Sequence, residues 1–494
     1  MARPHLASRL ALGISAFLAL EALPRAAHAG GYDTPILYSA RHMGMGGTAI
    51  GYVNDPSALF HNPAGLGGVR GLEVFANISP LMGTITTSPG SGEDSAPRAP
   101  GEFYPTRTTE RGMSPLFLVG AAYRVAEPVT FGFGVYPVAA AAGEYKLLSA
   151  PLGNMAGVPY IDKTRLVFLE FSPGVSVELM KGLYLGAGYR VTMTTLERVR
   201  GNEADPREFN FEVSGVDATG VRAGVQYRPS DNFSVGLVYR HRIDPELKAD
   251  SVRAVHLMRD GRTTFVLPSK LGVGVSGKME RLHGALDVEY GFYSQNTTST
   301  LTAERLDIVK TEQVVNYFEW QNAITGRVGL EYLLGPESQI PVRVGYIFDG
   351  KVGNRMYPTA FGTPPAPSHA LTAGAGYRGE KWQTNLAFAY RFSSTEVTSA
   401  DLVGAADCPS CSKPGRDYNL KIMGFYLDFS YRFDVAPLFG GAPAAAPAPP
   451  AQETVPLAAP PGPSPTPTPA PDPVPSPGPT PVPPPPTPSP TPSP

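Results

Sequence analysis

Apolar and polar side chains alternate without interruption along Gly424–Phe433 (GFYLDFSYRF). One face of this segment carries only apolar groups: Phe425, Leu427, Phe429, Tyr431 and Phe433. The opposite face includes Asp428 and Arg432. A period of two is the pattern of a β-strand, and this pairing of faces fits a strand between lipid and a wet lumen. For this segment taken alone, the alternative is an edge strand of a soluble sandwich.

The same alternation recurs along the chain and favours the membrane alternative. Lipid offers no partner to an unpaired backbone group, so strands can span a membrane only as a closed barrel. We therefore predict an all-β fold, a transmembrane antiparallel β-barrel of about fourteen strands over residues 72–434. The predicted strands are Leu72–Thr87, Pro115–Val125, Val129–Val138, Arg165–Leu179, Leu183–Arg198, Asn210–Arg228, Phe233–Leu247, Thr263–Lys278, Leu282–Tyr293, Val314–Leu334, Pro341–Phe348, His369–Arg378, Trp382–Phe392 and Tyr418–Phe433.

The connections between these segments alternate in length. Short ones carry turn residues, as in Lys181-Gly182 and Gly379-Glu380. Short turns at one end and long loops at the other are typical of outer-membrane barrels, and an even strand count puts both ends of the barrel in the periplasm. Long loops are predicted near residues 88–114, 139–163, 199–209, 248–262, 294–313, 349–368 and 393–417.

Residues 1–29 have the features of a secretory signal peptide. Arg3 and Arg9 precede an apolar stretch, Leu10–Leu20, and Ala27-His28-Ala29 is a small-x-small cleavage site. We expect the mature chain to start at Gly30 and to reach the bacterial outer membrane as a multi-pass barrel. No later run of about 18 apolar residues predicts a transmembrane helix.

Residues 435–494 form a Pro-rich tail. Such a composition cannot bury a core, so the tail is predicted to be disordered and extended in the polyproline II conformation. About sixty residues at roughly 3.1 Å each could reach on the order of 180 Å. The tail therefore suits a periplasmic tether to the cell wall or to a periplasmic protein.

Candidates for reactive chemistry are few. The two cysteines, Cys408 and Cys411, are predicted to close a loop disulfide in an oxidising compartment, with free thiols and redox or metal chemistry as alternatives. A zinc site would need four ligands, and no second cysteine pair exists, so no metal and no cofactor are predicted. We predict no enzyme, because no nucleophile motif accompanies the histidines that could act as a catalytic base. The candidates considered are His61, His241, His256, His283 and His369. A net charge of -2 indicates no nucleic-acid partner.

A glycine-rich segment without alternation, residues 30–71, precedes the first strand. It contains Arg41–Ile50 (RHMGMGGTAI) and Asn54–Leu66 (NDPSALFHNPAGL). These stretches resemble the start of the FadL-type outer-membrane transporters, the long-chain fatty acid and aromatic hydrocarbon channels, although Thr48 stands where that family often has Ala. Val342–Asp349 and Leu371–Tyr377 are similar to its late strands.

The resemblance covers about residues 30–434 and implies that residues 30–71 fold as a hatch that plugs the barrel. It also implies that a hydrophobic ligand enters near the extracellular loops and leaves through a wall opening at a strand kink. The residues matching the hatch motif are Gly44, Gly46, Gly47, Asp55, Asn62, Pro63 and Ala64. Glycines there permit positive φ and close packing in a plug.

These observations favour passive uptake of hydrophobic small molecules, with long-chain fatty acids as the favoured substrate. An inward arginine could pair with a ligand carboxylate. The candidates are Arg190, Arg327, Arg343 and Arg391. The alternative function is a structural anchor tethered through the Pro-rich tail.

Overall fold

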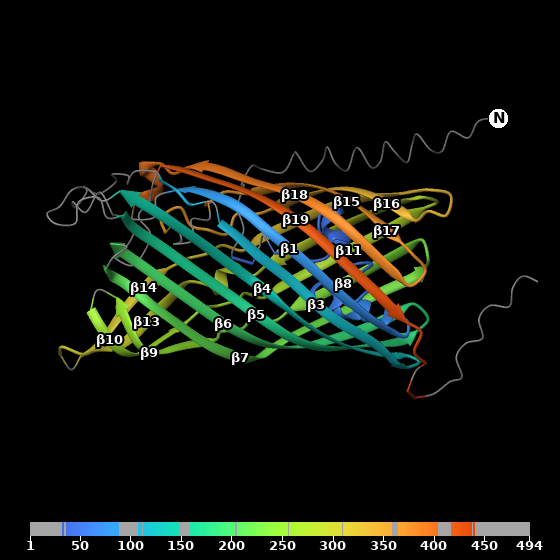
Figure 1. The fold of residues 1–494 in the computed structure, drawn as a ribbon, viewed down its shortest axis with the longest axis horizontal. Coiled ribbons are helices and arrows are strands. Elements are labelled where there is room, and N and C mark those ends of the chain that lie inside the picture. Colours follow the sequence, from blue (N-terminus) through green and yellow to red (C-terminus); the bar gives the residue numbers. More distant parts are fainter. Residues whose placement is uncertain are drawn as a thin grey trace, which may run out of the picture. The chain divides into compact units, whose positions relative to one another are not determined.

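The computed structural model describes residues 32–33, 36–87, 107–110, 112–148, 159–202, 205–254, 256–308, 310–357, 364–403, 416–436 and 438–439. The predicted signal peptide, the Cys408–Cys411 pair and the predicted Pro-rich tail beyond residue 439 lie outside the described residues. Most of the described chain forms one antiparallel β-barrel (Figure 1).

Fourteen strands form the barrel wall and cross from one end of the barrel to the other, as the alternating segments predicted. Each pairs antiparallel with its neighbours, and the last returns to the first, with Leu72 opposite Phe433. The crossing strands are β1 (Leu72–Thr87), β3 (Gly112–Ala126), β4 (Val129–Leu148), β5 (Pro159–Met180), β6 (Leu183–Asn202), β7 (Asp205–Ser230), β8 (Phe233–Arg240), β11 (Lys270–Met279), β12 (Leu282–Gly291), β15 (Ala323–Leu334), β16 (Ile340–Asp349), β17 (Ser368–Arg378), β18 (Trp382–Glu396) and β19 (Asp417–Phe433).

Several segments predicted as long loops are in fact strand. β4 to β7 continue well into residues 139–163 and 199–209, and two hairpins occupy much of 248–262 and 294–313. Residues 139–142 are four alanines, and the segment 246–254 carries charged side chains on both faces, so these stretches lack the alternation that marks a strand between lipid and lumen. The additional strands are β2 (Arg107–Thr108), β9 (Glu246–Ala254), β10 (His256–Thr264), β13 (Thr298–Arg305) and β14 (Thr311–Tyr317).

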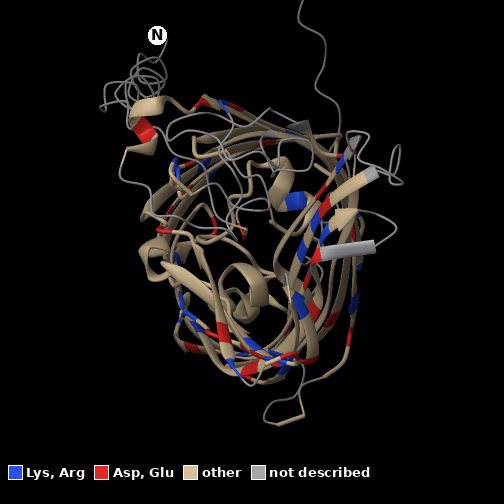
Figure 2. Cartoon of the chain, turned by 90° about the vertical axis from the view of Figure 1, so that its left-hand side faces the viewer, with Lys and Arg blue, Asp and Glu red and all other residues tan. Residues whose placement is uncertain are grey.

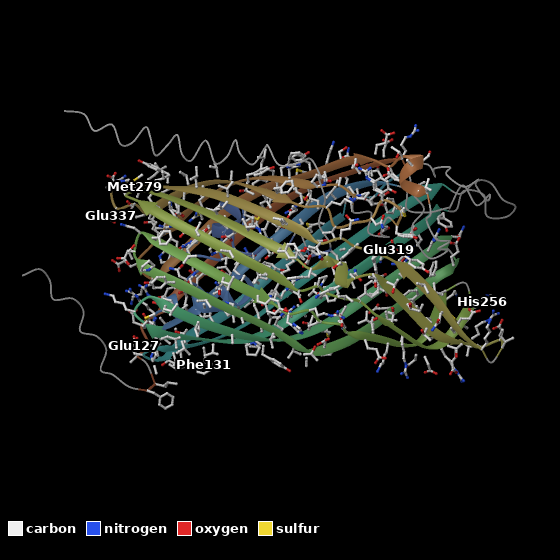
Figure 3. All side chains as sticks on the ribbon, turned by 180° about the vertical axis from the view of Figure 1, so that it is seen from behind. Glu127, Phe131, His256, Met279, Glu319 and Glu337 are labelled. Carbon is white, nitrogen blue, oxygen red and sulfur yellow. The ribbon has the colours of Figure 1, made fainter. Side chains whose placement is uncertain are left out.

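The two faces of the wall differ as the alternation predicts. On β12, Leu286 and Val288 are 48% and 45% exposed on the outside, whereas Asp287 between them is 1% exposed and points inward. Each of the fourteen crossing strands carries at least one exposed large apolar side chain, and Figure 3 shows side chains projecting from one side of the wall. An apolar surface of this extent is matched by lipid rather than by water. A view from one end shows charged residues of both signs around the wall (Figure 2).

The two ends of the barrel are distinct. Glu127, Met279 and Glu337 mark tight turns at one end, which we call the short-turn end (Figure 3). His256 lies toward the other end, which carries β9, β10, β13 and β14 and which we call the long-loop end (Figures 1 and 3). No helix in the described ranges is long and apolar enough to cross a membrane.

Candidate functional site

Residues 36–70, which we call the hatch, fold inside the barrel. They form α2 (Ala40–Gly44), α3 (Ala58–His61) and the 3-10 helix η1 (Pro63–Gly68). α2 packs on β16 to β19, and η1 packs on β4 to β7, so the hatch contacts opposite arcs of the wall. Nearly all of its residues are buried.

Inward-facing glycines let the hatch backbone touch the wall backbone. A Cβ added to Gly329 of β15 would overlap the carbonyl of Met45, and one added to Gly186 of β6 would overlap the backbone of Ala64. Backbone atoms cannot rotate away as a flexible side chain can, so these positions require glycine. The wall glycines that meet the hatch backbone in this way are Gly186, Gly236, Gly274, Gly329 and Gly345, while Gly224 meets the side-chain amide of Asn62.

The residues predicted as the hatch motif lie at these contacts. Asn62 donates to the carbonyls of Ile50 (2.9 Å) and Val225 (3.1 Å) and accepts from the Ala64 N–H (3.2 Å). Pro63 and Ala64 open η1 and are buried, and Ser176 of β5 donates to the Ala64 carbonyl (3.0 Å).

The glycines and the aspartate of the motif shape the turns of the hatch. Gly46 and Gly47 have φ of 66° and 73°, a region that favours glycine. Gly44 packs against Gly374 of β17. Asp55 accepts from the Ser57 N–H (2.9 Å) and lies 3.5 Å from Arg41.

Carboxylates of the wall hold the hatch backbone. Asp287 of β12 accepts from the N–H groups of Ala49 (2.7 Å) and Ile50 (3.1 Å). Asp428 of β19 accepts from the Ser39 hydroxyl (2.9 Å) and the Arg41 N–H (3.2 Å). The hatch is therefore bound by specific polar contacts as well as by packing.

A buried ion cluster connects β5, β6 and β7. Glu170 of β5 contacts Arg190 of β6 (2.6 Å) and Arg222 of β7 (3.3 Å), and all three side chains are at most 3% exposed. Tyr136 donates to Glu170 (2.6 Å), and Arg222 also donates to the Leu59 carbonyl of the hatch. Two guanidinium groups thus share one carboxylate where the wall meets the hatch.

Two histidines of the hatch are buried in the neutral form. Burial lowers the pKa of His61 to about 4, and Arg327 and Arg222 act in the same direction, although a bond to the Tyr38 carbonyl opposes them. Burial and the neighbouring His61 also lower the pKa of His42 well below its usual range. Both rings therefore resist protonation while the hatch is docked.

We expect docking of the hatch to weaken as the pH falls from about 6.5 to 4. The histidines of a displaced hatch bind protons in this pH range, whereas those of the docked hatch stay neutral. His61 alone therefore lowers the free energy that holds the hatch in place by up to about 3 kcal/mol, because one pKa unit corresponds to about 1.4 kcal/mol. Hydrogen exchange of residues 36–70, corrected for intrinsic rates, measures this loss. His61→Gln keeps a donor for the Tyr38 carbonyl and is expected to remove part of the pH dependence; full protection at pH 4 in the native chain would contradict the prediction.

The wall is open between β3 and β4. In the described ranges these strands pair from Val119↔Val135 to Ala126↔Val129, while β4 beyond the irregularity at Pro137 continues to pair with β5. Farther along, the Glu110 N–H donates to the Glu144 carbonyl (2.9 Å), which closes the gap again. The result is a window in the wall rather than a split edge.

A mostly apolar cavity of about 750 Å³ passes through this window. Inside the barrel it is lined by Ile36, Ser368 and Leu420, and Met113 and Phe117 of its lining are exposed on the outer wall. Its volume falls within the range of small-molecule pockets, about 300–1,000 Å³. The cavity therefore offers a route for an apolar molecule between lumen and lipid.

Only Arg391 of the four arginines predicted to bind a carboxylate lines this cavity, and it is already paired with Asp349. Arg190 belongs to the Glu170 cluster. Arg327 lies 3.4 Å from Glu289, and Arg343 lies 2.7 Å from Glu331. All four brace the wall or its contact with the hatch.

Sequence reasoning did not identify the charged group beside the cavity. Asp33 is buried between Arg240 of β8 (2.6 Å) and Lys270 of β11 (3.1 Å), and Tyr293 donates to its other oxygen (3.0 Å). Burial by itself would raise the pKa of Asp33, but Lys270 and Arg240 outweigh it and hold the pKa well below its usual range. More than two hundred residues separate Asp33 from its partners, so no local pattern could reveal them.

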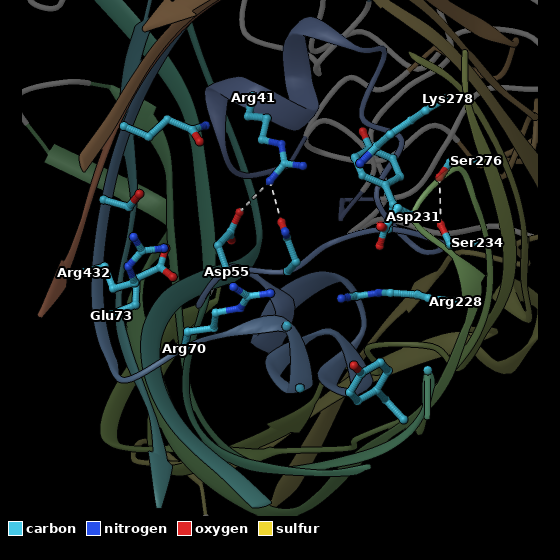
Figure 4. A pocket seen from close by; sticks show the side chains of 18 of the residues that line it. Arg41, Asp55, Arg70, Glu73, Arg228, Asp231, Ser234, Ser276, Lys278 and Arg432 are labelled. Atoms are coloured by element: carbon cyan, nitrogen blue, oxygen red, sulfur yellow. Dashed lines mark hydrogen bonds and ion pairs between the residues drawn. The ribbon is translucent and has the colours of Figure 1, made fainter. Parts of the chain in front are cut away.

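A second cavity of about 1200 Å³ lies under the hatch at the short-turn end, and its lining is mostly charged and polar (Figure 4). Arg41 reaches from α2 to Asn54 (2.7 Å) and Asp55, and Arg70 and Arg228 also line the space. The two cavities therefore differ in character: the wall window is apolar, and the vestibule under the hatch is polar.

A closed barrel with an apolar exterior, an internal hatch and a window toward lipid defines an outer-membrane transport channel. The model of the outer membrane protein transport protein family (OMPP1/FadL/TodX) matches residues 25–433. The chain belongs to this family, which confirms the resemblance seen in the sequence.

Solved structures share the fold at low sequence identity. A Pseudomonas aeruginosa FadL homologue superposes with a TM-score of 0.61 at 15% identity, covering 82% of this chain and 100% of that one. The Pseudomonas putida toluene transporter TodX gives 0.58 at 16%, covering 80% and 98%. The Ralstonia pickettii toluene transporter TbuX gives 0.54 at 15%, also covering 80% and 98%. No curated protein matches the sequence.

Proposed function

We propose that the protein is a channel for the passive uptake of hydrophobic small molecules, with long-chain fatty acids as the favoured substrate, through hatch rearrangement and lateral release. The observation that carries this proposal is the apolar cavity through the β3–β4 window. The long-loop end faces the cell exterior, and the short-turn end faces the periplasm.

Energetics favour the window over the vestibule as the exit. Burying each CH2 group gains about 0.8 kcal/mol, so a chain of about fourteen CH2 groups would lose about 11 kcal/mol on leaving an apolar cavity for water. Lipid outside the window replaces the lost contacts, whereas the polar vestibule under the hatch does not. Lateral release therefore lets cargo leave without this penalty.

Contacts at the lip of the window join it to the N-terminal residues. The Tyr38 hydroxyl donates to the Pro137 carbonyl (2.6 Å), and the Ala140 N–H donates to the Tyr32 carbonyl (3.2 Å). The Pro137 carbonyl and the Ala140 N–H both lie where β4 departs from β3. A shift of the hatch would therefore act directly on the width of the window.

Filling the window should stop uptake. Ala141 lines the cavity on β4, opposite the buried Leu166, so Ala141→Trp is expected to reduce uptake of palmitate at least about tenfold by blocking the route. Uptake of labelled palmitate and, separately, of toluene by cells or proteoliposomes measures the effect. The toluene arm decides whether aromatic hydrocarbons share the route, because two of the related structures are toluene transporters.

The matched control is Ala121→Trp. Ala121 lies on β3 where that strand is fully paired, opposite Phe133 of β4. This variant should assemble and transport like the native chain. Undiminished palmitate and toluene uptake in Ala141→Trp would rule out the window as the exit.

A further inference from the structure

Residues 434–436 and 438–439, which we call the rim strap, follow β19 at the short-turn end of the barrel. In Figure 1 this red segment projects beyond the outline of the wall. The cavity under the hatch is lined by Arg432 of β19 but by none of the described residues of the rim strap. The rim strap therefore lies at the outer edge of the barrel, to the side of the vestibule.

The rim strap fills an edge that the first strand leaves open. β1 begins at Leu72, which is opposite Tyr123 of β3, so the residues of β3 that follow Tyr123 extend past the start of β1. The Phe439 N–H donates to the Val125 carbonyl (3.0 Å), and Phe439 forms a parallel bridge with Ala126. A strand edge with unpaired backbone groups readily pairs with another segment, and here the rim strap is that segment.

Two side-chain contacts hold the first residues of the rim strap. The Tyr123 hydroxyl donates to the Ala436 carbonyl (2.5 Å), and Asp434 lies 2.7 Å from Lys381 in the turn between β17 and β18. Tyr123 shares the outer face of β3 with the exposed Val119. The rim strap is therefore fixed to the outer side of the wall at both of its ends.

The rim strap exposes two large apolar side chains. Leu438 and Phe439 are 68% and 70% exposed. Such exposure is unfavourable in water, because apolar surface gains free energy on leaving water. The apolar outer wall continues down to this level, since Phe433 at the end of β19 is exposed, as is Phe131 of β4, which is opposite Tyr123 (Figure 3). The lipid that covers the wall therefore reaches the two side chains as well.

We propose that the rim strap is a membrane anchor, and that Leu438 and Phe439 insert into the lipid leaflet at the short-turn end. The partner is the phospholipid of that leaflet, met at the boundary between headgroups and acyl chains. The rim strap is too short to cross a bilayer, since a crossing strand needs about 9–11 residues. Glu127 and Lys381 are exposed at the same end and set the depth, because charged side chains stay among the headgroups.

Insertion has a consequence for the vestibule. It would hold the residues that follow β19 at the side of the barrel, so that the rim strap does not cover the cavity under the hatch. The inference concerns the partner of the rim strap, and it does not depend on which molecule the channel carries.

The test places a tryptophan in the rim strap of the purified full mature chain, in nanodiscs of brominated phosphatidylcholine with one chain in each disc. The exposed Trp382 is replaced by Phe in every variant, whereas Trp320 is buried in the core and serves as a constant background. Phe439→Trp should lose about half or more of its added emission, because an interfacial side chain lies about 5–10 Å into the boundary between headgroups and acyl chains. Bromine near the glycerol end of the acyl chains should quench more than bromine near the methyl end.

The matched control is Val403→Trp. Val403 is 74% exposed and follows η4 (Ser399–Leu402) after β18, at the long-loop end, so bromine should not quench its tryptophan. A second variant adds Tyr123→Phe to Phe439→Trp. Loss of the hydroxyl that holds Ala436 should reduce the quenching and leave the heat-modifiable mobility of the barrel unchanged.

Each outcome decides part of the inference. Quenching of Phe439→Trp without quenching of Val403→Trp supports the anchor, and equal quenching of the two would overturn it. An unquenched Phe439→Trp that emits as in water would also overturn it. Emission that shifts to the blue only in discs with two chains would assign the rim strap to a second copy of the chain instead of to lipid. Quenching that Tyr123→Phe leaves unchanged would show that this hydrogen bond does not position the rim strap.

Discussion

Replacing Gly329 by Val is expected to expel the hatch and to open the barrel to polar solutes. The added side chain would overlap the carbonyl of Met45. The contact lies between two backbone segments, that of β15 and that of the hatch, so neither can rotate away. Overpacking of a filled interior costs about 1–3 kcal/mol when side chains can adjust, and backbone overlap leaves little room to adjust. The hatch can escape this overlap only by leaving its seat.

The barrel itself should remain assembled in this variant. The strand pairs of β15 with β12 and β16 do not involve side chains, so the heat-modifiable mobility of the folded barrel should be unchanged. Conductance across a planar bilayer and entry of large polar antibiotics into cells should both rise strongly. Gly326→Val on the same strand is the control, because a Cβ there would meet nothing within 4 Å. A closed, non-conducting Gly329→Val channel would show that the hatch does not depend on this contact.

Replacing Glu170 by Gln is expected to destabilise the barrel by about 3–5 kcal/mol. Glu170 is the carboxylate between Arg190 and Arg222, and removing one partner of a buried ion cluster leaves charge without compensation. Unfolding by denaturant in detergent micelles measures the loss. The double variant Glu170→Gln/Arg190→Met should recover part of it, because it removes one of the two uncompensated cations.

A partly exposed ion pair provides the comparison. Glu197 of β6 contacts Lys163 of β5 at 2.6 Å, with side chains 27% and 34% exposed. Exposed pairs contribute about 0–1 kcal/mol, so Glu197→Gln should have little effect. Similar losses of stability for Glu170→Gln and Glu197→Gln would show that the buried cluster contributes no more to the free energy of unfolding than an exposed ion pair does.

The barrel could be predicted from sequence because lipid imposes a simple rule on each strand. Every crossing segment needs one apolar face, and the rule is visible in any window of about ten residues, such as Leu282–Tyr293. The rule ends where the wall leaves the lipid. The sequence therefore did not predict the breaks that separate β8 from β9, β10 from β11 and β14 from β15. The predicted segments that run through these breaks are Phe233–Leu247, Thr263–Lys278 and Val314–Leu334.

The site was less predictable because distant residues form it. The position of the window had a local signal, since Pro137 precedes the small residues of β4, and the predicted strand ended at Val138. The buried carboxylate of Asp33 had none, because Arg240 and Lys270 read as ordinary lumen residues until the chain is folded. Alternation distinguishes inward from outward side chains, but it does not tell which inward charges meet.

The length of several strands has a consequence for the proposed route of uptake. A strand needs about 9–11 residues to cross a bilayer, yet β5, β6 and β7 have 22, 20 and 26 residues. These strands therefore extend beyond the span of a bilayer at the long-loop end, where β9, β10, β13 and β14 also lie. In the proposed orientation, an apolar molecule that moves along the inside of this extension would be shielded from the hydrated, charged surface of the outer leaflet.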